Sequence, residues 1–302
     1  MVPRRVLLLI NPQSRSGKDA SSQVRAELSR LGLEVVPDHD TSPADFREAV
    51  RTHAASVDAV VIAGGDGSVN AALPALLEVD LPVAVIPLGT SNNLARELEI
   101  PLELKEACGI IFTGSPKRVD VASVNDLPFL VVAGMGVSIH VNREVKSDLK
   151  KRFGMFAYIF TALRVFRTFR AFRAEITTPS RSVCIKTLQI SVCNGKHFGS
   201  GLTVASDAAI DDGELDLFSV EVKRWWQIPG VVLALRKGTY EKHHPVFHLR
   251  AKELTLTTSR PMSVDTDGEI TTKTPARFSL RKSALSVFAP VGPALADTPV
   301  KL

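Results

Sequence analysis

Continuous apolar runs alternate with amphipathic stretches over the first hundred residues, and this alternation constrains the fold more than any other feature. The apolar runs, each of which we expect to form a strand, cover residues 6–10, 33–37, 58–65 and 82–87. The stretches with helical periodicity cover residues 20–31, 44–54, 69–77 and 91–98. Strands that are apolar on both faces are typical of parallel sheets covered by helices. We therefore predict an α/β domain with an N-terminal parallel sheet of the nucleotide-binding type.

Short strand-like segments follow one another after about residue 115, with one basic, helical stretch near residues 149–173. Each segment is expected to form a strand: KRVDVASVND, PFLVVAGMG, AEITT, KTLQISVCN, ELDLFSVEV, HLRAKELTLT, PMSVDTDGEI and ARFSLRK. Many short strands separated by turn residues indicate an antiparallel sheet or sandwich. We therefore place the α/β domain at residues 1–125 and a mostly antiparallel, sandwich-like β domain at residues 126–289. Residues 290–302 are expected to pack back on the first domain.

The composition limits where such a chain works. Three cysteines, Cys108, Cys184 and Cys193, are an odd number without a CxxC motif, which favours a reducing compartment such as the cytoplasm. The apolar run at residues 6–10 is too short for a signal peptide. The longest stretch without a charged residue, 127–142, is shorter than the roughly 18 residues of a spanning helix. A net charge of +5 favours anionic partners, whether a nucleic acid, a membrane surface or a phosphate-bearing ligand.

A glycine-rich loop follows the third apolar run. Gly64, Gly65 and Gly67 surround Asp66 and precede Ser68, at the point where a strand gives way to a helix. Glycines let the backbone turn sharply and approach a ligand, and backbone N–H groups at the start of a helix bind phosphate. Asp66 also suits a role in holding Mg²⁺. The same residues are also consistent with an ordinary strand-to-helix turn that Asp66 or Ser68 caps.

Two more polar loops follow apolar runs. Residues 87–93, PLGTSNN, again end a strand at a glycine and start a helix with good capping residues. Neighbouring parallel strands bring this loop and the first one to the same edge of the sheet, where ligands bind, so we predict a shared phosphate site. The third loop, residues 11–18, NPQSRSGK, lacks the spacing of a P-loop.

Five segments resemble, in order and spacing, the diacylglycerol kinase catalytic domain family, which includes bacterial lipid kinases and sphingosine kinases. They are NPQSRSGK, GGDGSVNAAL, PLGTSNNLAREL, the segment from Cys193 to Val220, and VDTDGEI. The resemblance covers nearly the whole chain, and five ordered motifs make it specific, although GGDG alone is shared with NAD kinases and phosphofructokinases. It implies a kinase that transfers the γ-phosphoryl group of ATP to a lipid hydroxyl such as that of diacylglycerol. ATP would bind between the two domains, with Mg²⁺ as a cofactor.

The resemblance also implies roles for single residues. The nucleotide would contact Asn11, Ser14, Thr41, Gly64, Gly65, Asp66, Gly67, Ser68, Val69, Asn70, Ala71, Gly89 and Thr90. Asp66, Asp267 and Glu269 would be catalytic, with Glu269 as the proton acceptor. A base near the acceptor hydroxyl would take its proton as the γ-phosphoryl group moves in line.

Two acidic turns also have a plainer interpretation. Asp267–Gly268 between alternating residues is a strong hairpin signal, so that on its own this segment favours a turn. Asp211–Glu214 is likewise typical of a solvated acidic turn, although such turns also bind hard cations. The resemblance places a Mg²⁺ site in the second turn, made by Asp212 and the backbone carbonyls of Ala209 and Glu214.

Three positions depart from the family pattern. Ser68 replaces a threonine and keeps a hydroxyl group, whereas Ala71 and Asn93 stand where the family has glutamate and aspartate. The shared GGDG leaves an NAD kinase-like phosphotransferase as one alternative, although PLGTSNNLAREL and NPQSRSGK count against it. The two lost acids leave a second alternative, a regulator that binds nucleotide or lipid without catalysis. Turnover of ATP would distinguish this regulator from a kinase.

The segment near residues 149–173 carries concentrated positive charge. Residues 149–174 hold seven Lys or Arg and no Asp or Glu, with phenylalanines at helical spacing. One interpretation is an interfacial helix that contacts anionic lipid. The other is a helix whose Phe face packs on the second domain while its Arg face meets water. A lipid kinase is expected to be cytoplasmic and peripherally membrane-associated, a homodimer is plausible from the relatives, and no nucleic-acid partner is expected because no stacking or zinc motif accompanies the charge.

Overall fold

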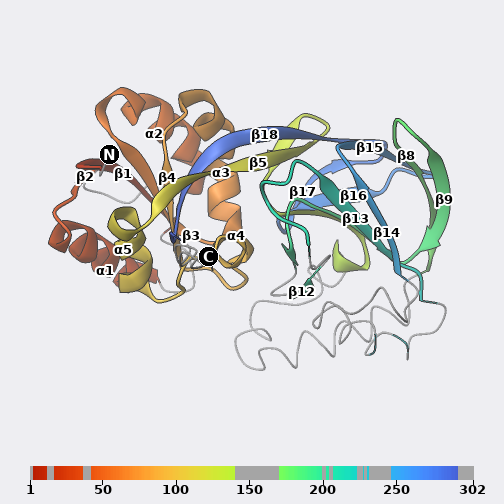
Figure 1. Cartoon of the computed structure of the whole chain (residues 1–302), viewed down its shortest axis with the longest axis horizontal. Helices are drawn as coiled ribbons and strands as arrows, with labels where there is room; N and C mark the ends of the chain where they lie inside the picture. The colour runs from red at the N-terminus through yellow and green to blue at the C-terminus, as the bar shows by residue number, and fades with distance from the viewer. Residues whose placement is uncertain are drawn as a thin grey trace, which may run out of the picture. The chain divides into compact units, whose positions relative to one another are not determined.

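The computed structural model describes residues 3–11, 17–36, 42–139, 170–198, 202–203, 207–222, 227, 230 and 246–291. The chain forms two compact units, which Figure 1 shows. The first unit contains Met1–Val119 and Leu285–Leu302, and the second contains Asp120–Ala284. Two strands, β5 (Ser115–Val124) and β18 (Ala276–Ala289), have residues in both units.

A parallel sheet forms the centre of the first unit. Its strands lie in the order β2 (Glu34–Val36), β1 (Arg5–Ile10), β3 (Ala59–Gly64) and β4 (Val83–Pro87). Every neighbouring pair among these four strands is parallel. The end of β18 pairs in parallel with β4. The predicted α/β architecture of this part of the chain is confirmed.

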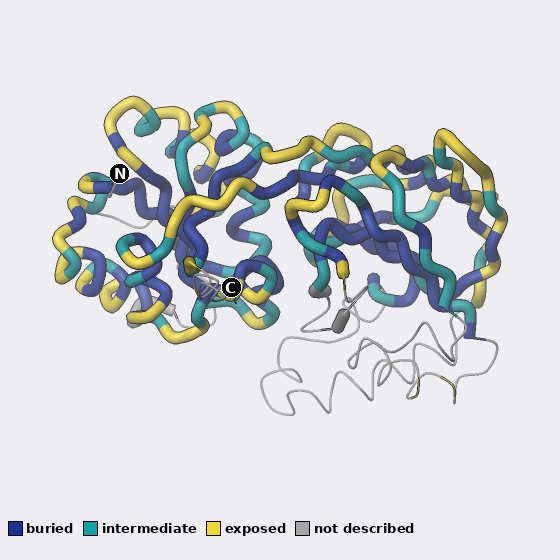
Figure 2. Tube along the Cα trace, in the orientation of Figure 1, coloured by how far each residue is buried: buried dark blue, intermediate teal, exposed yellow. Residues whose placement is uncertain are grey.

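Complete burial explains why the inner strands β1 and β3 are apolar on both faces, whereas the edge strand β2 has no fully buried residue. Every residue from Val6 to Ile10 in β1 is buried, and β3 is buried throughout its length. Figure 2 shows the central strands of this unit in dark blue. The helices of the unit are α1 (Gly17–Arg30), α2 (Phe46–His53), α3 (Asp66–Val79), α4 (Asn93–Glu97) and α5 (Leu104–Thr113). Helix α5 was not predicted, and Glu103 caps it by accepting a hydrogen bond from the backbone N of Glu106 at 2.9 Å.

The second unit contains two antiparallel layers. The strands, apart from parts of β5 and β18, are β6 (Leu127–Phe129), β7 (Val132–Gly136), β8 (Phe172–Thr177), β9 (Ser182–Thr187), β10 (Gln189–Cys193), β11 (His197–Phe198), β12 (Leu202–Thr203), β13 (Leu215–Val220), β14 (Val246–Ala251), β15 (Glu253–Thr258), β16 (Ser263–Thr266) and β17 (Glu269–Lys273). One layer is a six-stranded sheet in the order β14-β13-β10-β7-β16-β17. The other is formed by β18, β15, β8 and β9, with β5 and β6 beside them, and β11 pairs with β12. The predicted sandwich-like, antiparallel second part is confirmed.

One apolar core joins the two layers of this unit. The six-stranded sheet contributes residues such as Met135 and Leu217, and the other layer contributes residues such as Leu254 and Phe278. The rings of Phe129 and Phe278 meet edge to face, with centroids 6.4 Å apart and planes at 89°. Strands β7, β10 and β13 of the six-stranded sheet therefore turn alternate residues into this core, and the residues between them point to the opposite face.

Four of the expected strands are two strands each in the structure, and three of these four change layer between the two. PFLVVAGMG divides into β6 and β7 at Leu130–Val131, KTLQISVCN divides between β9 and β10 at Leu188, and HLRAKELTLT divides between β14 and β15 at Lys252. In each case the two strands belong to different layers. Where the chain passes from one layer to the other, its residues stay apolar because both layers face the same core. The local periodicity of the sequence therefore shows no boundary there. PMSVDTDGEI, expected as one strand, is the hairpin of β16 and β17.

The start of β8 corrects the end of the helix that was expected near residues 149–173. Phe172 already belongs to β8, in which Ala174 and Ile176 are buried while the residues between them are exposed. This period of two is that of a half-buried strand rather than of a helix. Residues 149–169 lie outside the described part of the chain, so the interfacial helix stays a prediction there.

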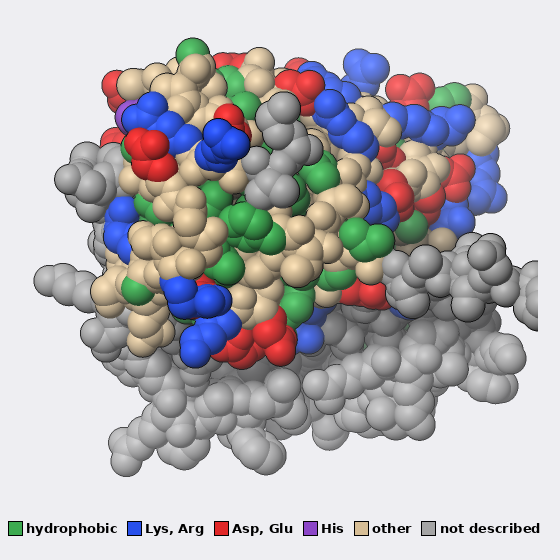
Figure 3. All heavy atoms as spheres, turned by 60° about the vertical axis from the view of Figure 1, so that its left-hand side comes forward, with side chains coloured by type: hydrophobic (Ala, Val, Ile, Leu, Met, Phe, Trp, Pro, Cys, Tyr) green, Lys and Arg blue, Asp and Glu red, His purple; other side chains and the backbone are tan. Residues whose placement is uncertain are grey.

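Charged side chains of both signs are mixed on the face that Figure 3 shows. The first unit also contains ion pairs between exposed side chains, Arg51 with Glu78 at 2.7 Å and Arg118 with Asp80 at 2.7 Å. Within the described ranges, no helix has the length and apolar character that crossing a membrane requires.

Candidate active site

The two glycine-rich loops of the first unit meet at the carboxyl edge of its sheet. Gly64, at the end of β3, lies beside Pro87, at the end of β4. Just beyond these residues, a Cβ atom added to Gly89 would lie 2.5 Å from the Cα atom of Gly65. A side chain at position 89 has no room in this arrangement, so glycine is required there. The structure thus places the two predicted phosphate loops in contact.

Asp66 fastens one loop to the other. Its Oδ2 atom accepts a hydrogen bond from the backbone N of Asn93, and its Oδ1 atom accepts one from the backbone N of Leu94, both at 3.0 Å. These residues begin α4, so Asp66 caps a helix that lies 27 and 28 positions further along the chain. The sequence suggested Asp66 as a cap for the helix that it begins, whereas the distant cap has no local signal.

Asn92 closes the second loop, although its position in PLGTSNN suggested no particular role. Its backbone has a φ of 48°, a left-handed conformation that asparagine tolerates better than most residues. Its Oδ1 atom accepts a hydrogen bond from the N of Gly89 at 2.9 Å, and its Nδ2 atom donates to the O of Gly89 at 3.0 Å. This pair of bonds fixes the backbone of the loop where Gly89 approaches Gly65.

The start of α3 provides backbone donors at the same edge. The N–H groups of Ser68 and Val69 donate back to the O atom of Gly65, at 2.9 and 3.4 Å, and both side chains are buried. The first N–H groups of a helix, here those of Asp66 and Gly67, have no acceptor within the helix and suit an anion. The predicted phosphate contacts therefore fit the backbone of Asp66 and Gly67 better than the side chains of Ser68 and Val69.

The remaining residues predicted to contact the nucleotide are only partly described. Asn11 follows β1 at the same carboxyl edge of the sheet, and Thr90 is exposed in the second loop. Asn70 and Ala71 lie within α3, and the O atom of Ala71 accepts a hydrogen bond from Arg47 Nε at 3.1 Å. Ser14 and Thr41 lie outside the described residues.

The acidic turn of the second unit is held together by Asp212. Its Oδ2 atom accepts a hydrogen bond from the backbone N of Ala209 at 3.1 Å, and its Oδ1 atom accepts one from that of Glu214 at 2.9 Å. Asp212 itself is exposed. The carboxylate therefore contacts the N–H groups of the two residues whose carbonyl oxygens were predicted to share a metal ion with it.

The donor types in this turn suit a hydrated Mg²⁺ ion. Magnesium is commonly bound through one or two carboxylates while it keeps several water ligands. The exposed Asp212 carboxylate and the neighbouring backbone oxygens meet that requirement. Among the described residues, no group of three His, Cys, Asp or Glu side chains is arranged to hold a metal ion. A magnesium ion bound here would therefore keep most of its water ligands.

Asp120 anchors the acidic turn to β5 and was not recognised from the sequence. Its Oδ2 atom accepts a hydrogen bond from the N of Gly213 at 2.8 Å, and its Oδ1 atom accepts one from the N of Ser283 at 2.7 Å. Its own N–H donates to the O atom of Ile210 at 2.9 Å. Asp120 is 2% exposed, so both bonds satisfy a buried carboxylate. An acidic residue in a strand-like segment gives no sequence signal for this role.

Arg250 of β14 ties the same turn to the six-stranded sheet. Its Nε atom lies 3.1 Å from Asp216 Oδ1 and 3.5 Å from Glu214 Oε2, and its guanidinium also contacts Asp207 at 3.2 Å. His248 Nε2 lies 2.7 Å from Asp216 Oδ1. Burial lowers the pKa of Arg250, but the hydrogen bonds and charges of Asp216 and Asp207 raise it by more. Arg250 therefore stays charged and compensates the buried Asp216.

Asp267 and Gly268 form the turn between β16 and β17, as the Asp-Gly pair predicts. Both have positive φ, 47° and 98°, and Thr266 pairs with Glu269 across them. This is the geometry of a two-residue type I′ hairpin, which favours Asp-Gly. The turn by itself explains why these two residues occur together.

The carboxylate of Asp267 also binds the backbone of the link between β6 and β7. Its oxygens accept hydrogen bonds from the backbone N atoms of Leu130, Val131 and Val132, at 3.3, 3.5 and 2.9 Å. Glu269, at the start of β17, is exposed. Of the two predicted catalytic acids in this hairpin, Asp267 thus fixes the turn and Glu269 presents its side chain at the surface.

Asp265 is a third acid in the hairpin and was not predicted as a site residue. It is 8% exposed, and its Oδ1 atom has no hydrogen-bond partner within the described part of the structure. Burial raises the pKa of Asp265 to about 7, and the charge of Asp267 adds to this effect. Strand periodicity alone does not tell whether the face away from the core is exposed, so the burial of Asp265 could not be predicted.

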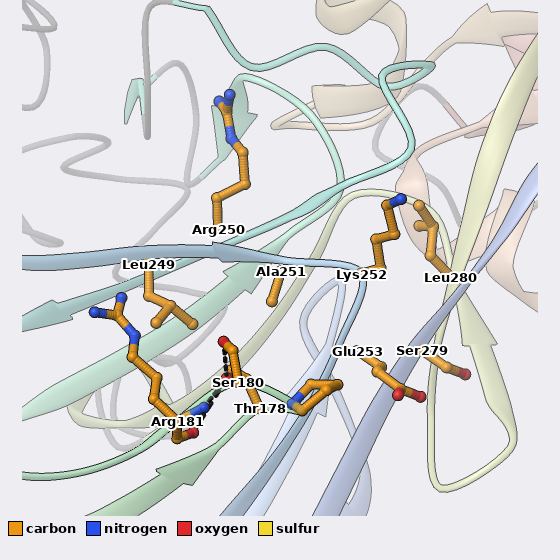
Figure 4. A pocket seen from close by; sticks show the side chains of 11 residues that line it. Thr178, Ser180, Arg181, Leu249, Arg250, Ala251, Lys252, Glu253, Ser279 and Leu280 are labelled. Carbon is orange, nitrogen blue, oxygen red and sulfur yellow. Dashed lines mark hydrogen bonds between the residues drawn. The ribbon is translucent and has the colours of Figure 1, made fainter.

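A hollow of about 840 Å³ opens on the second unit. Figure 4 shows that it is lined by the β8–β9 turn at Thr178–Arg181, by Leu249–Glu253 where β14 passes into β15, and by Ser279 and Leu280 of β18. The backbone N of Arg181 donates to Thr178 Oγ1 at 3.2 Å, which shapes this turn. No residue predicted from the sequence to bind ATP, metal or substrate lines the hollow.

Two family models match the chain. The diacylglycerol kinase catalytic domain matches residues 5–124, and the YegS C-terminal NAD kinase beta sandwich-like domain matches residues 131–289. The second match covers more than half of the chain. Together the two models include both glycine-rich loops, the acidic turn and the hairpin.

Individual proteins and structures are also similar. An uncharacterised protein of Synechocystis sp., sll0036, is 31% identical over 240 residues, which are 77% of this chain and 55% of that protein. A Pseudomonas savastanoi pv. phaseolicola protein named "Probable lipid kinase YegS-like" is 29% identical over 99% of this chain and 96% of its own length. A crystal structure from Bacillus anthracis str. Sterne, provisionally described as a diacylglycerol kinase, superposes with a TM-score of 0.80 at 27% identity and covers 96% of each chain.

Proposed function

Because the chain belongs to the diacylglycerol kinase family, with a YegS-type C-terminal domain, we propose that it is an ATP-dependent lipid kinase. The reaction transfers the γ-phosphoryl group of ATP to the hydroxyl group of a lipid alcohol, with diacylglycerol as the first candidate. The relative named as a lipid kinase supports this reaction class over nearly the full length of both chains.

The observation that carries the proposal is the junction of the two glycine-rich loops. Gly65 and Gly89 pack backbone against backbone, and Asp66 binds the start of α4 through two hydrogen bonds of 3.0 Å. Their backbone lies at the carboxyl edge of a parallel sheet, where nucleotides bind in such folds. Donors fixed in advance cost no reorganisation when charge develops on a transferring phosphoryl group.

The hairpin of β16 and β17 is the proposed source of the proton acceptor. Glu269 is exposed, so an acceptor hydroxyl is able to reach its carboxylate. Asp267 holds the turn in place through the N–H groups of Leu130 and Val132. Removing the hydroxyl proton as the phosphoryl group arrives is the general-base step of phosphoryl transfer.

Asp212, with the backbone oxygens of Ala209 and Glu214, would hold Mg²⁺ in the acidic turn. When bound, the ion would supply positive charge that offsets the acidic side chains of the turn. The hydrogen bonds of Asp120 and the charge of Arg250 would keep this turn in position whether or not metal is bound. Removal of Mg²⁺ is therefore expected to weaken the turn rather than to unfold the unit.

We expect the reaction to take place at a membrane surface. A lipid alcohol resides in the membrane, so we expect a cytoplasmic enzyme that associates peripherally with the membrane surface. The basic stretch at residues 149–173 is the predicted contact with anionic lipid, and a homodimer is the predicted assembly. Flotation with anionic vesicles and sedimentation of the free protein would test these two expectations.

Transfer of labelled γ-phosphate to lipid alcohols in mixed micelles tests the proposed reaction. The panel contains diacylglycerol, a sphingoid base and phosphatidylglycerol, with NAD as a soluble acceptor. Wild type, Asp66→Ala and Glu269→Ala are compared with Glu253→Ala, an exposed acid on β15 outside the predicted site. We expect a labelled lipid with wild type and Glu253→Ala, and a loss of about 100-fold or more in the other two variants. Label on NAD alone, or ATP binding without any turnover, would overturn the proposal.

A further inference from the structure

The β16–β17 hairpin contains a buried acid that the proposed reaction does not use. Asp265 lies two residues before Asp267 and is 8% exposed. Its Oδ1 atom is buried without a hydrogen-bond partner among the described residues. A buried polar atom that lacks a partner costs free energy, and such groups persist mainly where they have a role.

The surroundings of Asp265 contain few hydrogen-bond donors, and the hydroxyl group of Ser138 is itself buried without a partner among the described residues. Its neighbour across the strand pair is Gly134 of β7, and a Cβ atom there would lie 2.7 Å from Asp265 Oδ1, 3.2 Å from Ser138 Oγ and 3.4 Å from Gln189 Nε2. Gln189 already donates from Nε2 to the O atom of Ile190 at 3.0 Å and to a serine hydroxyl of β10 at 3.2 Å. Its Oε1 atom accepts from the N of Ser138 at 2.8 Å. The glycine makes room for the carboxyl group, and burial raises the pKa of Asp265 by more than the hydrogen bond of the glycine's backbone lowers it.

Positive charge is likewise absent from the described residues that face Asp265. Gly134 on β7 and Gln189 on β10 are uncharged, and Ile270, its neighbour on β17, is apolar. Among the described residues, the charged group that acts on Asp265 is Asp267, which is also acidic. The neutral form of Asp265 is therefore favoured, because an ionised form would face a like charge in a buried position.

Asp267 is the group through which Asp265 affects the hairpin. Its carboxylate binds the N–H groups of Leu130, Val131 and Val132, and its own N–H donates to the O atom of Val132 at 2.8 Å. These bonds attach the turn to the link between β6 and β7. A second negative charge at Asp265 would repel this carboxylate and would itself need solvent, and both effects pull the turn away from β7.

We propose that Asp265 is a positioning residue whose neutral carboxyl group keeps the Asp267–Glu269 turn attached to β7, and whose ionisation releases that turn. The structural part of this proposal stands without any assumption about catalysis. Its effect on activity rests on the proposed function, because only then does Glu269 serve as the proton acceptor. A pKa of about 7 places the change near neutral pH.

Hydrogen–deuterium exchange of the whole protein tests the structural part. Peptides that cover residues 127–139 and 262–275 are compared at about pH 6 and about pH 8.5, after correction for the intrinsic pH dependence of exchange. The variants are Asp265→Asn, which is isosteric and stays neutral, and Glu253→Gln as a control at an exposed acid on β15. We expect corrected exchange to rise about tenfold with pH in wild type and Glu253→Gln, and to stay constant in Asp265→Asn. Constant exchange in wild type, or an equal rise in Asp265→Asn, would overturn the proposal.

Gly134→Ala gives an independent variant of the same contact. The added Cβ displaces the Asp265 carboxyl group, so the hairpin peptides should exchange rapidly at both pH values while peptides from β13 and β14 keep their protection. Unchanged protection of the hairpin in a folded Gly134→Ala protein would contradict the assigned role of Asp265. General loss of protection would only mean that this variant does not fold, and Asp265→Asn then decides.

Measuring kinase activity as a function of pH distinguishes the role of Asp265 from the proposed function. If wild type phosphorylates a lipid, its kcat/KM should fall by several-fold above about pH 7, and Asp265→Asn should lose this fall while its KM for ATP is unchanged. A fall that persists in Asp265→Asn would exclude an effect on catalysis. If no lipid is phosphorylated but exchange depends on Asp265 as expected, the proposed function fails and the positioning role stands.

Discussion

Asp66 and Leu94 lie 28 positions apart in the sequence, yet Asp66 Oδ1 accepts a hydrogen bond from the backbone N of Leu94 at 3.0 Å. With the bond from Asn93 to Oδ2, this contact makes one carboxylate the cap of α4 and the connection between two phosphate loops. The acid in the GGDG motif thus supports the shape of the neighbouring loop as well as its own.

Replacing Asp66 by alanine should affect both stability and nucleotide binding. We expect a loss of about 1–2 kcal/mol in the free energy of unfolding, because α4 loses its cap. ATP affinity should fall by more than about tenfold, because the second loop is no longer held against the first. Urea unfolding and calorimetric titration with ATP measure the two effects. Asp80→Asn, an exposed acid paired with Arg118 at the end of α3, should change neither by much.

Gly89→Ala should be costly, because the added Cβ would lie 2.5 Å from Gly65 Cα and 2.7 Å from Asn92 Oδ1. We expect a loss of about 1–3 kcal/mol in unfolding free energy and loss of ATP binding, since the two loops must separate. Gly109→Ala in α5 is the matched control, because nothing lies within 4 Å of the new Cβ. That change should stabilise the protein by roughly 0.5–1 kcal/mol. Equal effects of the two substitutions on ATP binding would contradict this account of the loops.

Asp120→Ala should loosen the acidic turn that is predicted to hold Mg²⁺. The N–H groups of Gly213 and Ser283 would lose their acceptor in a buried position, at a cost of about 1–3 kcal/mol. The affinity of Asp120→Ala for Mg²⁺, measured by calorimetry, should be lower than that of wild type, as should the affinity of Asp212→Ala. A variant that unfolds more readily but binds Mg²⁺ as wild type does would place the metal elsewhere.

Asp265→Asn should increase stability in a pH-dependent way. Folded Asp265 keeps its proton up to about pH 7, whereas the unfolded chain releases it near pH 3.8. Wild type therefore loses stability as the pH rises from about 4 to 7, and the asparagine variant does not share this loss. At about pH 8 the variant should be the more stable, by at most about 4 kcal/mol. Urea unfolding at a series of pH values checks this, and a difference that shrinks with rising pH would refute it.

Local patterns were sufficient for much of the fold. The runs at residues 6–10 and 58–65 predicted buried parallel strands because a strand that is apolar on both faces has to be covered on both faces. Asp267–Gly268 predicted a hairpin turn because its two positive φ values suit these residues. The glycines of the first loop predicted a close approach of the backbone to a ligand, which stays a prediction, whereas the contact of Gly65 with Gly89 was not predicted.

What the sequence by itself determined was therefore the periodicity, the turn types and the positions of the glycine-rich and acidic motifs, all of which depend on neighbours along the chain. Only the tertiary structure decided where strands change layer, as at Lys252, and which backbone groups the acids bind. Asp66, Asp120 and Asp265 show the reason. Each acquires its environment from segments that are distant in sequence, and strand order and register determine which distant groups come within hydrogen-bonding distance.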